Sequence, residues 1–263
     1  MSRIKQKFKQ LKKNNKKAFI PYVTGGYPSL DACERLIEVL AENGADIIEI
    51  GIPYSDPLAD GPTIQKASQI AISRGANTKN IFGMIKNLKK KIDVPLVIMT
   101  YYNTIYRYGE KKFAEEAAYA GVDGLIVPDL PPEEARSWRA LAKKNALDTI
   151  FLISPTSSDD RIKEIVSASS GFIYCVSLTG VTGARNSMPL ELSGFLSKVR
   201  SLTDKPLAVG FGISSANLAK EVSRLADGII IGSALIDLIN DSDIKYDKII
   251  KFVKNIKLAM ETS

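Results

Sequence analysis

The segment NGADIIEIG (residues 43–51) places Ala and then Asp ahead of a short apolar run, and similar segments return along the chain. It recurs as AGVDGLIVPD (residues 120–129) and as LADGIIIG (residues 225–232). A second related pair is DVPLVIMT (residues 93–100) and DKPLAVGF (residues 204–211). Internal sequence similarities of this kind are expected where one strand–helix unit repeats around a closed barrel.

Apolar runs rich in Ile and Val occur along the whole chain, and each is followed by a segment with helical spacing. The eight runs span residues 18–23, 46–50, 96–100, 124–128, 149–153, 172–177, 207–211 and 228–232. Two clear helical segments between them are SLDACERLIEVLAENG (29–44) and PPEEARSWRALAKKN (131–145). This alternation predicts an α/β fold with parallel strands. We predict a (β/α)8 TIM barrel rather than an open doubly wound sheet, because eight units are present and no GxGxxG motif follows the first run.

Length and composition predict one barrel domain over residues 1–263, preceded by an extra amino-terminal helix. The first seventeen residues carry Arg3 and seven lysines without an acid, and Ile4, Phe8 and Leu11 form one apolar stripe. This pattern is typical of an amphipathic helix with a solvated basic face, so we expect neither a nucleic-acid partner nor a membrane. Cys33 and Cys175 are expected to be reduced and buried, which favours a cytoplasmic protein.

The chain contains no histidine. Catalysis by Ser/His/Asp or Cys/His arrangements and the HExxH zinc helix are therefore excluded, and no metal site is expected. Acid–base chemistry in this chain must rely on carboxylates, with Tyr, Lys and backbone amides as helpers.

The block EIGIPYSDPLADGP (residues 49–62) ends the second apolar run on a glutamate and continues into a proline-rich loop. Strand alternation predicts that Ile47 and Glu49 face the barrel interior, with Glu49 at the carboxyl end of its strand, where barrel enzymes place catalytic groups. Asp60 follows in the loop and could fold back over the same pocket. Taken alone, Asp60 is better explained as an Asx-turn or helix-capping residue.

Three glycine-bearing segments follow the sixth, seventh and eighth predicted strands: TGVTGARNS (179–187), GFGIS (210–214) and GSA (232–234). Together they favour a phosphate monoester site that includes the start of a short helix after the eighth strand. The expected phosphate-binding residues are Gly183, Gly210, Phe211, Gly212, Gly232 and Ser233. The long connection from Leu178 to about Pro189 has the composition of a lid.

The chain resembles the tryptophan synthase alpha subunit family along almost its whole length. The segments that carry the resemblance are FIPYVTGGYP (19–28), EIGIPYSDPLADGPTIQ (49–65), YYN (101–103), VPDLP (127–131), GVTGAR (180–185), GFGIS and GSA. The long acidic block is the specific part, because the glycine segments alone occur in many barrels.

The resemblance implies a carbon–carbon lyase, which cleaves indole-3-glycerol phosphate to indole and glyceraldehyde 3-phosphate by a retro-aldol reaction without a cofactor. Glu49 stands at the position of the family's catalytic glutamate. Asp60 is expected to accept a hydrogen bond from the indole N–H, and Thr182 matches the lid threonine that meets this aspartate.

Apolar and aromatic residues near the predicted strand ends are expected to enclose the indole ring. They are Tyr22, Met99, Tyr101, Leu125, Ile153 and Tyr174. Tyr22 stands where other family members carry Phe, and Leu178 where some carry Arg.

The resemblance also implies a partner, the pyridoxal-phosphate beta subunit, in an alpha2beta2 complex contacted through Pro53 and Asp56. Asp56 fits a turn-forming residue as well. Two alternatives stay open at this point: a free-standing indole-3-glycerol-phosphate lyase, and a non-catalytic barrel that binds a sugar phosphate. Glu49 and Asp60 argue against the second, because binding a phosphate needs neither.

Overall fold

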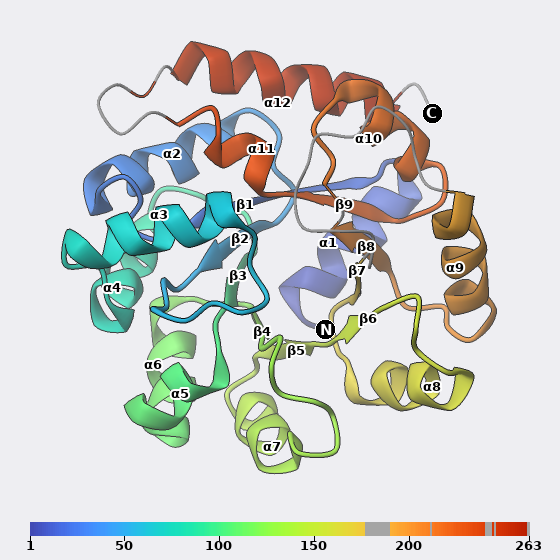
Figure 1. Cartoon of the computed structure of the whole chain (residues 1–263), viewed down its shortest axis with the longest axis horizontal. Coiled ribbons are helices and arrows are strands. Elements are labelled where there is room, and N and C mark those ends of the chain that lie inside the picture. Colours follow the sequence, from blue (N-terminus) through green and yellow to red (C-terminus); the bar gives the residue numbers. More distant parts are fainter. Residues whose placement is uncertain (177–189, 211, 240–243, 245, 262–263) are drawn as a thin grey trace.

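The strands of this chain form a single parallel sheet that closes into a barrel with helices around it (Figure 1). The computed structural model describes residues 1–176, 190–210, 212–239, 244 and 246–261. The strands are β1 (Ala18–Thr24), β2 (Ile48–Gly51), β3 (Leu96–Met99), β4 (Gly124–Ile126), β5 (Asp148–Ile150), β6 (Leu152–Ile153), β7 (Ile173–Val176), β8 (Leu207–Gly210) and β9 (Gly228–Ile231). Their spatial order is β5-β4-β3-β2-β1-β9-β8-β7-β6. The predicted TIM barrel is confirmed.

The predicted strand over residues 149–153 is divided into β5 and β6 at Phe151. These two short strands occupy the opposite ends of the strand order and are consecutive in the chain, so the backbone at Phe151 joins the two ends of the sheet. The Phe151 carbonyl accepts a hydrogen bond of 3.1 Å from the Tyr174 N–H of β7. The eight expected strands are therefore present, and the division of the fifth marks the place where the barrel closes.

The helices follow the strands in the expected alternation. They are α1 (Arg3–Lys13), α2 (Leu30–Glu42), α3 (Pro62–Ser73), α4 (Thr78–Leu88), α5 (Tyr102–Tyr108), α6 (Glu110–Ala120), α7 (Arg136–Lys144), α8 (Asp159–Ala168), α9 (Leu190–Ser201), α10 (Ala216–Ser223), α11 (Ser233–Ile236) and α12 (Tyr246–Glu261). The helix expected from Pro131 begins at Arg136, because the preceding residues form a turn in which Glu134 N–H donates to the Pro131 carbonyl. In the described part of the chain, no helix has the length and apolar character needed to cross a membrane.

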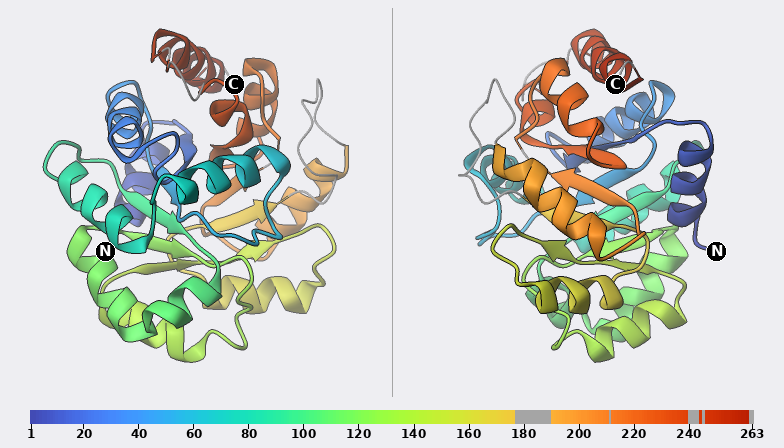
Figure 2. Two further views of the ribbon diagram at one scale, coloured as in Figure 1. Left: turned by 60° about the vertical axis from the view of Figure 1, so that its left-hand side comes forward. Right: turned by 90° about the vertical axis from the view of Figure 1, so that its right-hand side faces the viewer.

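The amino-terminal helix α1 closes one end of the barrel. Its buried residues are Ile4, Phe8 and Leu11, the stripe read from the sequence. The Ile4 Cδ1 atom lies 2.8 Å from the position that a Cβ on Gly124 would take, so a glycine at the start of β4 makes room for this helix. In the right-hand view of Figure 2, α1 lies on the opposite side of the molecule from the loop that follows β2.

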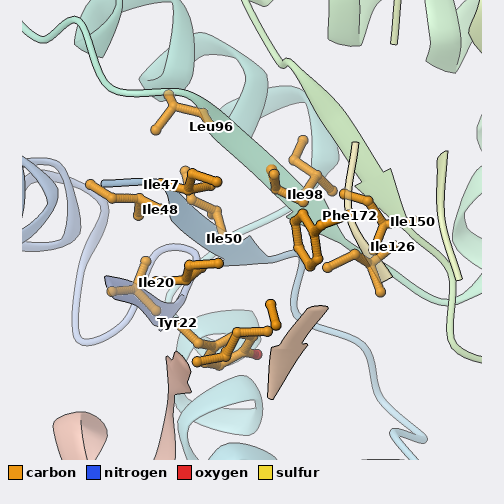
Figure 3. Packing of buried hydrophobic residues seen from close by; sticks show 14 of the residues in the cluster. Ile20, Tyr22, Ile47, Ile48, Ile50, Leu96, Ile98, Ile126, Ile150 and Phe172 are labelled. Carbon is orange, nitrogen blue, oxygen red and sulfur yellow. The ribbon is translucent and has the colours of Figure 1, made fainter. Parts of the chain in front are cut away.

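The register of the strands decides which side chains point into the barrel. Tyr22 of β1 pairs with Glu49 of β2, and Glu49 pairs with Val97 of β3. Neighbours in register on a parallel sheet point to the same face, and successive residues alternate. Ile50 points the other way, since it and Ile81 of α4 both approach Gly25. The register therefore confirms the expected inward orientation of Glu49. Figure 3 shows buried apolar side chains of the neighbouring strands, among them Tyr22, Ile50 and Ile126.

We expect Ile4→Ala to lower the free energy of unfolding by about 2–5 kcal/mol, because it leaves a cavity between α1 and the strands that this helix covers. Ile4 is fully buried. Urea denaturation measures the change, and Lys9→Ala on the exposed face of α1 is the matched control. Equal unfolding midpoints for the two variants would show that α1 does not seal the barrel.

Candidate active site

Glu49 is a buried carboxyl group on the inner face of the barrel. Its side chain is 1% exposed, and among the described residues neither carboxylate oxygen has a partner. Burial, together with the nearby charge of Asp60, raises the pKa of Glu49 to about 8. An ionised carboxylate at this place would be out of contact with solvent and, among the described residues, without hydrogen bonds, so the protonated form is favoured at neutral pH.

Asp60 lies in the loop after β2, close enough to Glu49 for its charge to act on that carboxyl. The Tyr101 hydroxyl donates a hydrogen bond of 3.2 Å to Asp60 Oδ2, and the Gln65 side-chain amide donates one of 2.9 Å to the Asp60 carbonyl. Burial raises the pKa of Asp60 to about 6, while the bond from Tyr101 opposes this rise. Asp60 is therefore mainly ionised at neutral pH.

The two carboxyls thus differ in protonation under the same conditions. Glu49 holds a proton that it can deliver, whereas Asp60 carries a negative charge that it can direct at a developing positive charge. Pairs of acids whose surroundings separate their pKa values in this way are typical of enzymes that combine a proton donor with an electrostatic stabiliser.

Two tyrosines lie beside these acids: Tyr22 is buried and Tyr174 is partly buried. Burial raises the pKa of Tyr22 and of Tyr174, and the charges of Asp60 and Glu49 contribute to both shifts. A Cβ added to Gly51 would collide with the Tyr22 hydroxyl, and one added to Gly210 would collide with the Tyr174 hydroxyl. These two glycines therefore leave the space that the tyrosine rings need.

The strand register corrects two of the expected pocket residues. Leu125 pairs with Ile98 of β3, and Ile153 pairs with Cys175 of β7, so both point toward the helices. The physical reason is the alternation of side chains along a strand, by which a shift of one residue exchanges the two faces.

Ile126 and Leu152 take the inward positions that sequence reasoning missed. Ile126 pairs with Met99, and Leu152 pairs with Tyr174. Tyr174 points inward, and its partner in register on β6 is Leu152. The pairing of these two strands is therefore the signal that would have identified Leu152. Met99, Tyr101 and Tyr174 themselves lie at the expected end of the barrel.

The described glycine segments meet at the same end of neighbouring strands. Gly210 ends β8 and pairs with Ile230 of β9, and Gly232 caps the short helix α11, which begins at Ser233. The ring of Tyr22 lies 3.3 Å from the position of a Cβ on Gly232, so this corner adjoins the carboxylate pocket. Of the other expected residues here, Gly212 is described, whereas Thr182, Gly183 and Phe211 lie outside the described residues.

The loop after β2 presents a surface as well as Asp60. Pro53 is buried, Asp56 is exposed and hydrogen-bonded by the Ser55 hydroxyl at 2.5 Å, and Leu58 is 94% exposed. A large apolar side chain that is almost fully exposed is a feature that sequence reasoning did not single out.

Comparisons with known proteins agree on one family. A family model described as tryptophan synthase alpha chain matches residues 8–262. The tryptophan synthase alpha chain of Dehalococcoides mccartyi is 46% identical over 261 residues, which cover 99% of this chain and 100% of that relative. A structure of Mycobacterium tuberculosis tryptophan synthase has a TM-score of 0.92 at 36% identity, with 98% of both chains covered. The tryptophan synthase subunit alpha of Legionella pneumophila has a TM-score of 0.93 at 35% identity over 100% of both chains.

We expect Glu49→Gln to change how stability depends on pH. The folded protein keeps the Glu49 proton up to its pKa of about 8, whereas an unfolded glutamate releases it at its ordinary value, so this group lowers the free energy of unfolding as the pH rises between the two values. The glutamine side chain does not titrate, so the variant lacks this decrease in unfolding free energy. Its stability relative to the parent chain should therefore grow with pH over that range by several kcal/mol, with about 5 kcal/mol as the upper bound.

Urea denaturation at a series of pH values measures this difference. Asp60 is present in both proteins, so its own titration contributes to both curves. A constant difference in unfolding free energy across the series would contradict a protonated Glu49.

Proposed function

The chain belongs to the tryptophan synthase alpha chain family and serves the alpha reaction of tryptophan biosynthesis, and we propose that Glu49 and Asp60 carry out this reaction as its two catalytic groups. As a lyase of this kind it would cleave the carbon–carbon bond between the indole ring and the side chain of indole-3-glycerol phosphate. The products would be indole and glyceraldehyde 3-phosphate.

The chemistry of this cleavage sets three requirements. Indole C3 must receive a proton, a hydroxyl of the glycerol chain must lose one, and the positive charge that develops on the indole N–H must be stabilised. The protonated Glu49 can deliver its proton to indole C3. Once ionised, it can accept the proton of the glycerol hydroxyl, so that one carboxyl serves as general acid and then as general base.

Asp60 meets the third requirement. Its carboxylate accepts a hydrogen bond from the indole N–H and becomes a stronger partner as this group gains positive charge, which stabilises the transition state more than the bound substrate. The observation that carries the proposal is the placement of the buried Glu49, whose pKa is raised to about 8, near the Asp60 carboxylate, to which the Tyr101 hydroxyl donates a hydrogen bond of 3.2 Å.

The remainder of the pocket suits an aromatic substrate with a phosphate. Tyr22, Met99, Ile126, Leu152 and Tyr174 surround the indole ring in this proposal, with Tyr101 beside Asp60. Phosphate would bind where β8 and β9 end, at Gly210, Gly212, Gly232 and Ser233, together with Gly183 and Phe211. The amino-terminal N–H groups of α11 point to the kind of anion site found in such barrels. Thr182 is proposed as the lid residue that meets Asp60.

The partner would be the pyridoxal-phosphate beta subunit, in an alpha2beta2 complex. The exposed Asp56 and Leu58 lie on the same loop as Asp60, which supports this loop as the contact surface, with the buried Pro53 shaping it. We also propose that the protein works in the cytoplasm, since Cys33 and Cys175 are free, buried thiols.

We expect Glu49→Gln to abolish indole release from indole-3-glycerol phosphate and Asp60→Asn to reduce kcat by at least about a hundredfold, since the amides cannot cycle a proton or carry the charge. Indole production is measured with and without a beta subunit, which also distinguishes the complex from a free-standing lyase. Glu115→Gln, at an exposed position on α6, is the matched control. Turnover of Glu49→Gln close to that of this control would overturn the proposed mechanism.

A further inference from the structure

We propose that Tyr101 is a positioning residue for Asp60, and that its hydroxyl fixes the carboxylate over the pocket while Tyr54 fixes the Tyr101 ring. The inference rests on the proposed function of Asp60. It assigns Tyr101 a task beyond packing against an indole ring.

The Tyr101 hydroxyl joins two successive residues of the loop after β2. It accepts a hydrogen bond of 2.9 Å from the Ala59 N–H and donates one of 3.2 Å to Asp60 Oδ2. The Tyr101 hydroxyl therefore acts both as acceptor and as donor toward residues of this loop. Because Tyr101 lies two residues after the end of β3 and is 6% exposed, the loop is attached at this point to the rigid wall of the barrel.

A second tyrosine holds the first one in place. The rings of Tyr54 and Tyr101 are stacked, with their centroids 5.1 Å apart and their planes inclined by 27°. The Tyr54 hydroxyl in turn accepts a hydrogen bond of 3.0 Å from the Asn103 side-chain amide on α5. The loop therefore contacts Tyr101 through Tyr54 near the start of the loop and through Ala59 and Asp60 near its end. These contacts hold the Tyr101 hydroxyl beside the Asp60 carboxylate.

The bond also matters for the charge of Asp60. Groups from several elements face this carboxylate: Tyr22 from β1, Glu49 from β2, Tyr174 from β7, and Tyr101 itself. Among the described residues, the Tyr101 hydroxyl is the group that lowers the pKa of Asp60 against the effect of burial. Burial raises the pKa of Tyr101, so the phenol remains protonated and able to donate. Loss of this hydroxyl should leave Asp60 protonated at a higher pH.

The test is Tyr101→Phe, which keeps the ring and the stack on Tyr54 and removes only the hydroxyl. A ¹³C NMR titration of aspartate carboxyls should show the Asp60 signal, identified by its absence in Asp60→Asn, moving to a higher pKa. The acidic limb of the kcat/KM profile should move up in the same direction. At neutral pH we expect a loss of about tenfold in kcat/KM that is partly recovered at higher pH.

Tyr102→Phe is the matched control. Its hydroxyl also donates to a carboxylate, Glu110 Oε1 at 3.0 Å, but this pair lies on α5 and α6 outside the pocket. The control should change neither the Asp60 titration nor the pH profile. Tyr54→Leu, which removes the stack and keeps the Tyr101 hydroxyl, should shift the Asp60 titration in the same direction as Tyr101→Phe.

A double variant separates positioning from packing. If Tyr101 acts through Asp60, Tyr101→Phe should cause no further loss of kcat in the Asp60→Asn background. Losses that multiply, or an Asp60 titration that stays unchanged in Tyr101→Phe, would overturn the inference. Failure of the proposed function would look different, because Asp60→Asn would then be fully active while the NMR titration still reported the contact with Tyr101.

Discussion

Burial of one carboxyl group inside a closed barrel is the constraint on which the site depends. Glu49 points inward from β2, between Tyr22 on one flanking strand and Val97 on the other. Among the residues that the structure describes, this acid has no hydrogen-bond partner, and its burial is costly unless it is protonated. The sheet closes at Phe151, and α1 covers the end of the barrel that lies away from the loop after β2. Both features keep solvent from the interior around Glu49, and this exclusion of solvent favours its protonated form.

The loop after β2 brings a second acid to the first. It leaves the barrel directly behind Glu49, and it returns Asp60 to the pocket through contacts with Tyr101 and Gln65. The same short loop exposes Asp56 and Leu58 to the outside. A partner that binds this surface would therefore act on an element that already holds one of the reacting groups, and a small movement of the loop would change the position of Asp60 without disturbing Glu49.

The barrel and the inward orientation of Glu49 could be predicted from the sequence, because repeated strand–helix units and a glutamate at a strand end are local patterns. Asp60 by itself was better explained as a turn or helix-capping residue, and its place near Glu49 is seen only in the structure. The sequence did not show which side chains of β4 and β6 point into the barrel. Leu125 and Ile153 were expected in the pocket, and the register gives these places to Ile126 and Leu152. In short, uniformly apolar strands nothing in the composition marks the inward face, so only pairing with a neighbouring strand decides it. The contact between Tyr101 and Asp60 joins residues far apart in the chain and likewise appears only in three dimensions.

The protonation state of Glu49 can be measured directly by infrared difference spectroscopy between the parent protein and Glu49→Gln, without substrate or partner. We expect a band of a protonated carboxyl group at neutral pH that is present in the parent, absent in the variant, and lost as the pH rises through about 8. A difference spectrum that shows only an ionised carboxylate at neutral pH would contradict the central claim that the closed barrel keeps this acid protonated.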